Sequence, residues 1–306
     1  MQKRYQIVEG RVAESAEDTA PIIVFSCPDT DEKRYMTECL KIDEHTLASA
    51  LDPDELSRLE FEPEHVAMIV KRPKNYSGAE QFMFRVNSMG IFLFKDRLIV
   101  VVADNDPLFE GKPFIALHSL VDVALKLIYR SIFHFLEHLK VINMVTDELE
   151  DKINASMENR FLINLFSLEK SLVYYLNAIH TNGVLITKIR ANMNKMGIDV
   201  QQSEYLDDIT VENDQCYKLA EIYSNVLSGL MDARVSIVSN NLNVIMKTLT
   251  IITLGIMLPT FVVSSFSMNV PMPLSKESPV TFWLIMGLAF VSGAIALVYW
   301  RYKKFW

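Results

Sequence analysis

Residues 244–266 read VIMKTLTIITLGIMLPTFVVSSF, and residues 280–300 read VTFWLIMGLAFVSGAIALVYW. Lys247 is the only formal charge in the first stretch, and the second stretch contains none. Each stretch matches the ~20 residues that a helix needs to cross the hydrocarbon core of a bilayer. The sequence therefore predicts two transmembrane helices, joined by a short external loop over residues 267–279.

The charges beside these stretches predict their orientation. Arg301, Lys303 and Lys304 follow the second span directly in a basic tail at residues 301–306, whereas the loop carries only Lys276 and Glu277. By the positive-inside rule, both termini face the cytoplasm, in a plasma or inner membrane. The three cysteines are scattered and form no CxxC pair, which agrees with a reducing compartment.

The first part of the chain, residues 1–115, predicts a cytoplasmic α/β domain. It contains four apolar runs of strand length, the last two of which flank Lys95-Asp96 as a hairpin: residues 21–25, 66–70, 90–94 and 97–102. We expect a helix over residues 45–59, with Asp52-Pro53 as a break or a helix start.

The next part, residues 116–243, predicts long helices. Apolar residues keep helical spacing from Val121 to Ile142. A second helix is expected over residues 159–181, with Asn182-Gly183 as a candidate irregularity and residues 196–199 as a turn. A third helix begins near Ser203 and shows no clear stop before Phe266, so about 60 residues at 1.5 Å each give a rod of roughly 90 Å. The predicted fold class is an α+β membrane protein whose stalk helix continues into the first of two transmembrane helices.

The first span carries a polar stripe. On a helical wheel, eight residues fall on one strip about 100° wide: Asn243, Met246, Thr250, Thr253, Met257, Thr260, Ser264 and Ser267. Polar groups inside a membrane face either protein or a water-filled path, so the stripe fits a helix-packing seam and a pore equally well. A pore lined by one such helix requires a symmetric ring of copies.

No acidic residue lies between Asp232 and Glu277. A cation path here would thus be lined by neutral amide, hydroxyl, thioether and backbone groups. Mg²⁺ gives up its waters reluctantly, so a neutral polar lining suits a hydrated ion.

Several motifs around the first span resemble the CorA family of Mg²⁺ transporters. They include Ser228-Gly229-Leu230-Met231-Asp232, Ser239-Asn240-Asn241-Leu242-Asn243, Met246-Lys247, Leu249-Thr250, the mid-span Pro259, Met268-Asn269 and Arg301-Tyr302-Lys303-Lys304. One departure is that Ser267-Met268-Asn269 stands where the family has Gly-Met-Asn. Serine restricts the positive φ that glycine permits, and the zinc-transporting branch of the superfamily also varies this tripeptide.

The resemblance implies a homopentamer in the bilayer that passes divalent cations passively, with the first span innermost. Mg²⁺ would be both substrate and regulatory ligand, Co²⁺ and Ni²⁺ further candidate ions, and no organic cofactor is expected. The implied pore residues are Asn269 with Met268 and Ser267 at the outer selectivity ring, Thr260 and Thr253 within the pore, hydrophobic constrictions at Met257, Leu249 and Met246, and an inner polar ring at Asn243. The implied regulatory carboxylates are Asp207 and Asp208, with Asp208 preferred, and Asp232 near the inner mouth.

Other functions are weighed against this one. His134, Glu137 and His138 fit the HxxEH zinc-peptidase pattern, but a hydrolase would need all three to point into one cleft, and we expect a partly exposed helix surface instead. The sequence has no nucleotide-binding glycine motif, and its net charge of −8 argues against nucleic acid as a partner. We therefore expect no enzyme. The alternatives that stay open are a zinc transporter and a non-conducting sensor of divalent ions from the same superfamily.

Overall fold

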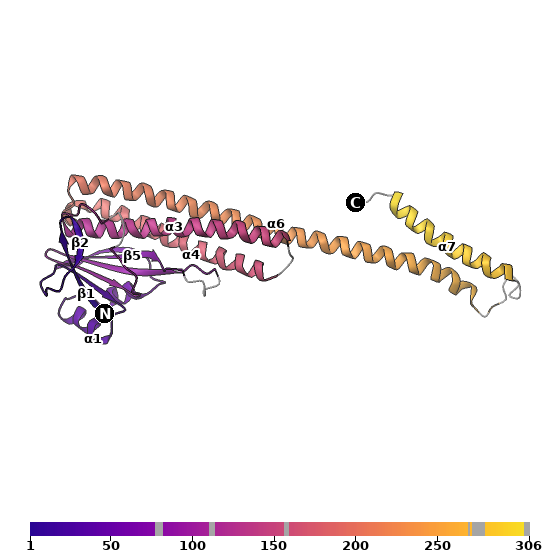
Figure 1. Cartoon of the computed structure of the whole chain (residues 1–306), viewed down its shortest axis with the longest axis horizontal. Helices are drawn as coiled ribbons and strands as arrows, with labels where there is room; N and C mark the ends of the chain where they lie inside the picture. The colour runs from indigo at the N-terminus through magenta and orange to yellow at the C-terminus, as the bar shows by residue number, and fades with distance from the viewer. Residues whose placement is uncertain (77–81, 110–113, 156–158, 269, 271–278, 303–306) are drawn as a thin grey trace. The chain divides into compact units, whose positions relative to one another are not determined.

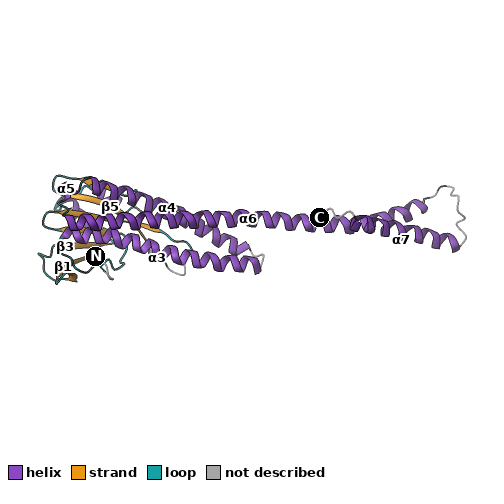
Figure 2. Ribbon diagram, turned by 90° about the horizontal axis from the view of Figure 1, so that it is seen from above, coloured by secondary structure: helices purple, strands orange, loops and turns teal. Residues whose placement is uncertain are grey.

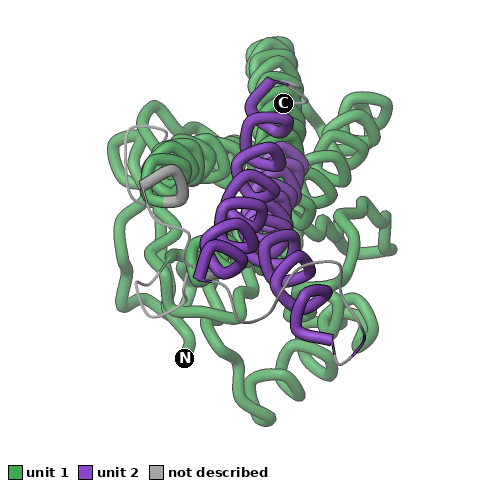
Figure 3. The backbone as a smooth tube through the Cα atoms, turned by 90° about the vertical axis from the view of Figure 1, so that its right-hand side faces the viewer, with its two compact units in different colours: residues 1–231 green, residues 232–306 purple. Residues whose placement is uncertain are grey.

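The computed structural model describes residues 1–76, 82–109, 114–155, 159–268, 270 and 279–302. The chain divides into two compact units, residues 1–231 and 232–306 (Figure 3). Helix α6 (Val200–Phe266) contributes to both units, and helix α7 (Pro279–Tyr302) belongs to the second. These are the two described helices that are long and apolar enough to cross a membrane.

The first unit contains a seven-stranded mixed sheet of order β2-β1-β3-β7-β6-β5-β4. β3 and β7 run parallel, and the other neighbours are antiparallel. The strands are β1 (Gln2–Val8), β2 (Arg11–Glu14), β3 (Ile22–Ser26), β4 (Arg58–Phe61), β5 (His65–Pro73), β6 (Val86–Phe94) and β7 (Leu98–Val102). The predicted runs at residues 21–25, 66–70, 90–94 and 97–102 each coincide with a strand, apart from Pro21 and Arg97, which precede β3 and β7. The last two runs form the predicted hairpin of β6 and β7.

Helices cover both faces of this sheet (Figures 1 and 2). On one face lie α3 (Leu120–Ala155), α4 (Asn159–Ala191) and the first part of α6, and on the other lie α1 (Thr30–Glu38) and α2 (Glu44–Leu51). All five residues of β7 are buried, and they alternate between the two cores. A strand covered on both sides is apolar without interruption, as LIVVV is.

The expected helix over residues 45–59 is wrong in its second half. α2 begins at the capping Asp43 and ends at Leu51, and β4 starts at Arg58. Leu59 pairs with Met68 of β5 instead of extending the helix. Tertiary pairing with a neighbouring strand outweighs the weak local helix preference.

Asn182-Gly183 does not interrupt α4, which runs unbroken from Asn159 to Ala191. Asn182 is fully buried, and its side-chain amide makes the hydrogen bonds that a neighbouring strand would make to the edge of β5. Its Oδ1 accepts from the Lys71 N–H at 2.9 Å, and its Nδ2 donates to the Lys71 carbonyl at 2.8 Å. β4 pairs with β5 only as far as Ile69, so Asn182 satisfies backbone groups that lie beyond the end of β4.

The turn predicted at residues 196–199 is confirmed. Short helix α5 (Met193–Met196) ends at Gly197, whose φ of +67° is the left-handed conformation that glycine adopts without strain. Asp199 then opens α6 with a capping box, because its Oδ1 accepts from the Gln202 N–H and Gln202 Oε1 accepts from the Asp199 N–H. The long helix thus starts three residues before the expected Ser203.

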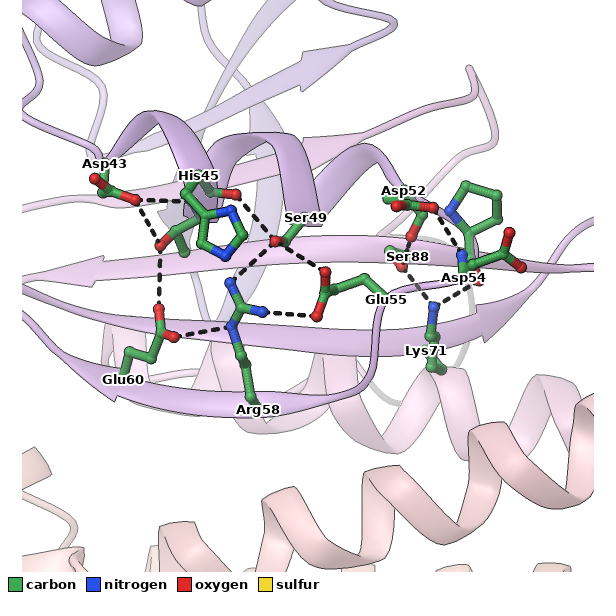
Figure 4. Close-up of polar contacts among 12 residues, drawn as sticks. Asp43, His45, Ser49, Asp52, Asp54, Glu55, Arg58, Glu60, Lys71 and Ser88 are labelled. Carbon is green, nitrogen blue, oxygen red and sulfur yellow. Dashed lines mark hydrogen bonds and ion pairs between the residues drawn. The ribbon is translucent and has the colours of Figure 1, made fainter.

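A polar cluster joins α2 to the sheet (Figure 4). Arg58 binds Glu55 at 2.7 Å and Glu60 at 2.9 Å, and it also donates to Ser49. Beside this cluster, the buried Lys71 donates from Nζ to the Pro53 carbonyl and to Ser88 Oγ. These side chains pair with one another, so the cluster holds α2 and β4 on the sheet.

Candidate ion path and regulatory site

The first candidate site is the polar stripe of α6. Its members are exposed in the single chain: the Met246 and Met257 side chains are 65% and 60% exposed, and Asn243, Thr253 and Thr260 are exposed as well. Leu249, the remaining candidate constriction, is 63% exposed. Ser267 and Met268 are also exposed, and Asn269 lies outside the described residues. Large apolar groups with this exposure require a cover that the chain itself does not supply.

Helix α7 contacts a different face of α6. Gly293 and Ala289 of α7 are buried, and a Cβ placed on Gly293 would lie 3.1 Å from Cγ of Pro259. Within residues 248–266 of α6, the partly buried positions are Ile251, Gly255, Pro259, Val262 and Phe266. At 100° per residue, the centre of this set lies roughly 180° from the centre of the polar stripe. Packing within the chain therefore leaves most of the stripe open.

The far end of the stripe is an exception. Thr260, Ser264 and Ser267 line a cavity of about 680 Å³ together with α7 residues such as Met286 and Phe290. Ser267 is not among the described residues with positive φ, and its Oγ donates to the Ser264 carbonyl at 2.9 Å. Serine is therefore accommodated at this position without backbone strain.

The threonines of the stripe share one hydrogen-bond pattern. Thr250, Thr253 and Thr260 each donate their hydroxyl to the carbonyl four residues earlier, at 2.7–2.8 Å. Each hydroxyl proton is therefore already donated to a carbonyl of the helix, and the oxygen lone pairs remain available to accept further hydrogen bonds. Waters around a cation point their hydrogens outward, so such acceptors match a hydrated ion.

The second candidate site surrounds Asp208, where the starts of α3 and α6 meet. Asp208 lines a hollow of about 510 Å³ with Asp122, Asp199 and Glu204, and with Lys126 as its cation. Four carboxylates against one ammonium leave three formal negative charges. Asp208 and Glu204 make no ion pair within the described part of the chain, so their charge is available to a ligand. Burial chiefly raises the pKa of the neighbouring Tyr205, with further contributions from Tyr129 and Asp208.

Asp207 lies in a different setting from Asp208. Asp207 forms an ion pair with Arg190 of α4 at 2.8 Å, and it does not line the hollow. Asp232 is exposed on α6 in the second unit.

Sequence reasoning missed the partners of Asp208 in the hollow. Asp122 closes a capping box at the start of α3, since it accepts from the Ser119 N–H and its own N–H donates to Ser119 Oγ. Gln202 of α6 then donates to Asp122 Oδ1 at 2.7 Å across 80 residues of sequence. The two capping boxes were readable signals in the sequence, but the link between them is purely tertiary.

The HxxEH residues do not all point into one cleft, although the His134 and His138 rings lie 4.4 Å apart between centroids. His138 is buried, and its Nδ1 lies 2.6 Å from the Tyr175 hydroxyl, while Glu137 binds Arg130 at 3.0 Å. His134 lines a small cavity that is lined by neither of the other two. Among the described residues, no group of three or more His, Cys, Asp or Glu side chains is placed to hold a metal ion.

An α/β part with a helical layer, followed by two bilayer-length helices with a polar stripe on the first, is the architecture of a two-span membrane protein. A model of the family described as CorA-like Mg²⁺ transporter protein matches residues 19–303. This chain belongs to that family and is a CorA-family divalent cation transporter.

Individual relatives agree with this assignment. The cobalt/magnesium transport protein CorA of Methanocaldococcus jannaschii is 25% identical over 303 residues, covering 93% of this chain and 92% of the relative. Its namesake from Thermotoga maritima is 25% identical over 166 residues, covering 54% of this chain and 47% of the relative.

Solved structures agree in fold. The complete CorA magnesium transporter of M. jannaschii matches with a TM-score of 0.76 at 23% identity, covering 98% of this chain and 96% of that one. The full-length CmaX protein matches with a TM-score of 0.73 at 15% identity, covering 99% of this chain and 97% of that one.

Proposed function

We propose that this chain carries Mg²⁺, and with it Co²⁺ or Ni²⁺, passively through a pore made by five copies, with the polar stripe of α6 facing the path. The observation that carries the proposal is that most of the stripe faces away from α7 and stays exposed. A seam used to pack the two spans of one chain would be covered by α7. The relatives named as cobalt/magnesium transport proteins supply the choice of ions.

The path is assigned from outside to inside. Asn269, next to Ser267 and Met268, forms the outer ring, Thr260 and Thr253 offer hydroxyl acceptors, and Met257, Leu249 and Met246 form apolar constrictions that close by excluding water. Asn243 forms the inner polar ring, and both chain termini lie in the cytoplasm.

The hollow at Asp208 is the proposed regulatory site. Carboxylates gathered in a ring of five copies repel one another, and a bound dication relieves that repulsion. Cytoplasmic Mg²⁺ bound there, supported by the ring of Asp232 nearer the mouth, would hold the pore closed. Loss of the ion lets the copies separate and the constrictions wet.

The test is Mg²⁺ flux into proteoliposomes, with paired threonine variants. Thr253→Val removes an acceptor from the stripe, whereas Thr248→Val removes the same kind of bond, from its hydroxyl to the Val244 carbonyl at 2.9 Å, at a position off the stripe. We expect a severalfold loss of flux for Thr253→Val and none for Thr248→Val.

Two results would overturn the proposal. One is ion binding without any flux in the wild type, which would identify a sensor. The other is a functional unit that proves to be a monomer or a dimer when the detergent-purified protein is cross-linked or its mass is measured.

A further inference from the structure

An apolar groove of about 580 Å³ lies between α6 and α7 within the second unit. It shares only Gly255 and Leu297 with the cavity at Thr260 and Ser264, so it opens on the other flank of α7. Tyr299 and Trp300 line it near the end of α7. Its apolar lining consists of Ile251, Leu254, Leu258, Ile295, Ala296 and Leu297.

The groove faces away from the polar stripe. At 100° per residue, the centre of its α6 residues lies roughly 130° from the centre of the stripe. Neighbouring copies in a closed ring lie on the inward side of one another, so the groove faces outward to lipid; this direction rests on the proposed pore. An empty gap would forfeit the dispersion contacts of its walls, so an acyl chain is the natural filling.

Two basic residues lie at the same level beyond one end of the groove. A Cβ on Gly293 would lie 3.1 Å from Cγ of Pro259 and 3.9 Å from the Gly255 carbonyl oxygen. Lys247 lies eight residues before Gly255, and Arg301 lies eight residues after Gly293. Because the two helices are antiparallel, both basic residues lie about 12 Å along the axis from this contact, in the same direction.

The charge at this end favours an anionic partner. No Asp or Glu occurs at residues 233–276 or 278–306, so neither span offers these two bases an acidic side chain. Lys247 lies one turn before Ile251 and therefore on the helix face that lines the groove. Arg301 directly follows Trp300, and tryptophan in a span prefers the level of the lipid headgroups. The apolar groove thus ends where a lipid phosphate would lie.

We propose that this groove binds one anionic phospholipid, with an acyl chain along α6 and the headgroup phosphate between Lys247 and Arg301. Basic pockets between transmembrane helices are typical binding sites for anionic headgroups, and guanidinium donors match phosphate oxygens. From Ile251 to Leu258 the groove runs about 10 Å along α6, which accommodates part of one acyl chain. The site uses no residue of the polar stripe or of the hollow at Asp208.

The experiment uses Trp300 as a reporter, because its side chain lines the groove. In the full-length protein, Trp283→Phe and Trp306→Phe leave Trp300 as the only tryptophan. The protein is reconstituted into vesicles of phosphatidylcholine and phosphatidylglycerol in which one of the two lipids carries bromine on its acyl chains and quenches nearby tryptophan. At equal mole fraction, we expect brominated phosphatidylglycerol to quench Trp300 severalfold more strongly than brominated phosphatidylcholine. No ion flux is measured, so failure of this proposal and failure of the proposed transport are observed separately.

Paired variants separate a lipid site from general attraction to a basic surface. Ala296→Phe fills the groove and should abolish the preference for phosphatidylglycerol, whereas Val298→Phe, at an exposed position that does not line the groove, should retain it. If Ala296→Phe fails to fold, the smaller Ala296→Leu makes the same test. Lys247→Gln should reduce the preference about fivefold, the effect of one basic residue at an anionic membrane surface. Lys218→Gln, exposed on α6 in the first unit, should leave it unchanged.

Three results would overturn the proposal. A preference that persists when position 296 is filled would show general attraction of anionic lipid only. Absence of quenching by either brominated lipid would show that a second copy of the chain covers the groove. An equal loss of preference in Lys218→Gln and Lys247→Gln would show that the net charge of the protein, not this site, selects the lipid.

Discussion

The two halves of α6 bury their apolar residues in different ways. In the first unit, Leu206 and Ile209 of α6 are 0% exposed against the helical layer. In the second unit, no residue in the apolar window of α6 is buried by the chain, and Phe261 is 71% exposed. The first unit completes its core from its own sequence, whereas the apolar residues of the span in the second unit are left uncovered by the chain itself.

This difference predicts how each unit responds to mutation. Substitutions in the first unit should change the stability of a structure that one chain already completes. Substitutions in the second unit should change assembly and the passage of ions.

The largest effect is expected at Asn182. Asn182→Ala leaves the Lys71 N–H and carbonyl buried without their partners, which should lower the free energy of local opening of β5 by about 3 kcal/mol. Hydrogen exchange of the peptide that contains Lys71 measures it. Asn192→Ala is the control, because Asn192 is only partly buried and its side chain donates to the Lys188 carbonyl near the end of α4 rather than to the sheet. Equal acceleration in both variants would contradict the role of Asn182.

In the second unit, the contact of α7 with α6 can be tested with two glycines. Gly293→Val places methyl groups where a Cβ alone would already lie 3.1 Å from Pro259, whereas a Cβ on Gly287 meets nothing within 4 Å. We expect Gly293→Val to destabilise the two-helix contact by about 2 kcal/mol, as overpacking typically does, with loss of flux. Thermal stability in detergent and flux are the measurements, and Gly287→Val should leave both unchanged.

The proposed regulation is tested by comparing neighbouring aspartates. Asp208→Asn removes a carboxylate from the hollow, whereas Asp207→Asn removes the partner of Arg190. We expect Asp208→Asn to raise the internal Mg²⁺ concentration for half-inhibition of flux about tenfold, since each tenfold change corresponds to ~1.4 kcal/mol. Asp207→Asn should shift it less, and the double variant should be insensitive. Full inhibition of the double variant at an unchanged midpoint would place the regulatory site elsewhere.

The parts that sequence predicted well are those with local signals. The apolar spans and the long helix follow from composition and periodicity, which do not depend on distant residues. β2 and β4 were missed because each has only four residues, and β1 was missed because its residues are at most half buried and give no apolar run. Leu59 was misassigned because its partner in β5 lies outside any local window.

The candidate sites divide in the same way. The polar stripe was readable because its eight members recur at helical spacing, but the face used by α7 was not, since Gly293 and Pro259 meet only in three dimensions. The hollow at Asp208 could not be predicted from the sequence, because it depends on the hydrogen bond from Gln202 to Asp122, which joins two helix starts. Asn269 and residues 271–278 lie outside the described residues, so the outer ring stays a prediction.

The smallest expected effect concerns the buried Lys71 of the first unit (Figure 4). Burial lowers its pKa to about 8, against the opposing charges of Asp52, Asp54 and Glu55. The unfolded chain holds this proton up to the ordinary lysine pKa of about 10.4. Between these values the unfolded state binds more protons, so the free energy of unfolding rises with pH.

Relative to Lys71→Met, the wild type should therefore gain about 1 kcal/mol of stability between about pH 7 and about pH 9. Methionine cannot donate to the Pro53 carbonyl or to Ser88, so Lys71→Met is less stable than the wild type at every pH. The informative quantity is therefore the slope of the free energy of unfolding with pH. Thermal unfolding followed by the helical circular dichroism signal measures it. As a control, the stability of Lys95→Met, which changes an exposed lysine, should depend on pH in the same way as that of the wild type. If the stability of Lys71→Met also follows the wild-type pH dependence, Lys71 keeps its proton across this range because its hydrogen bonds offset its burial.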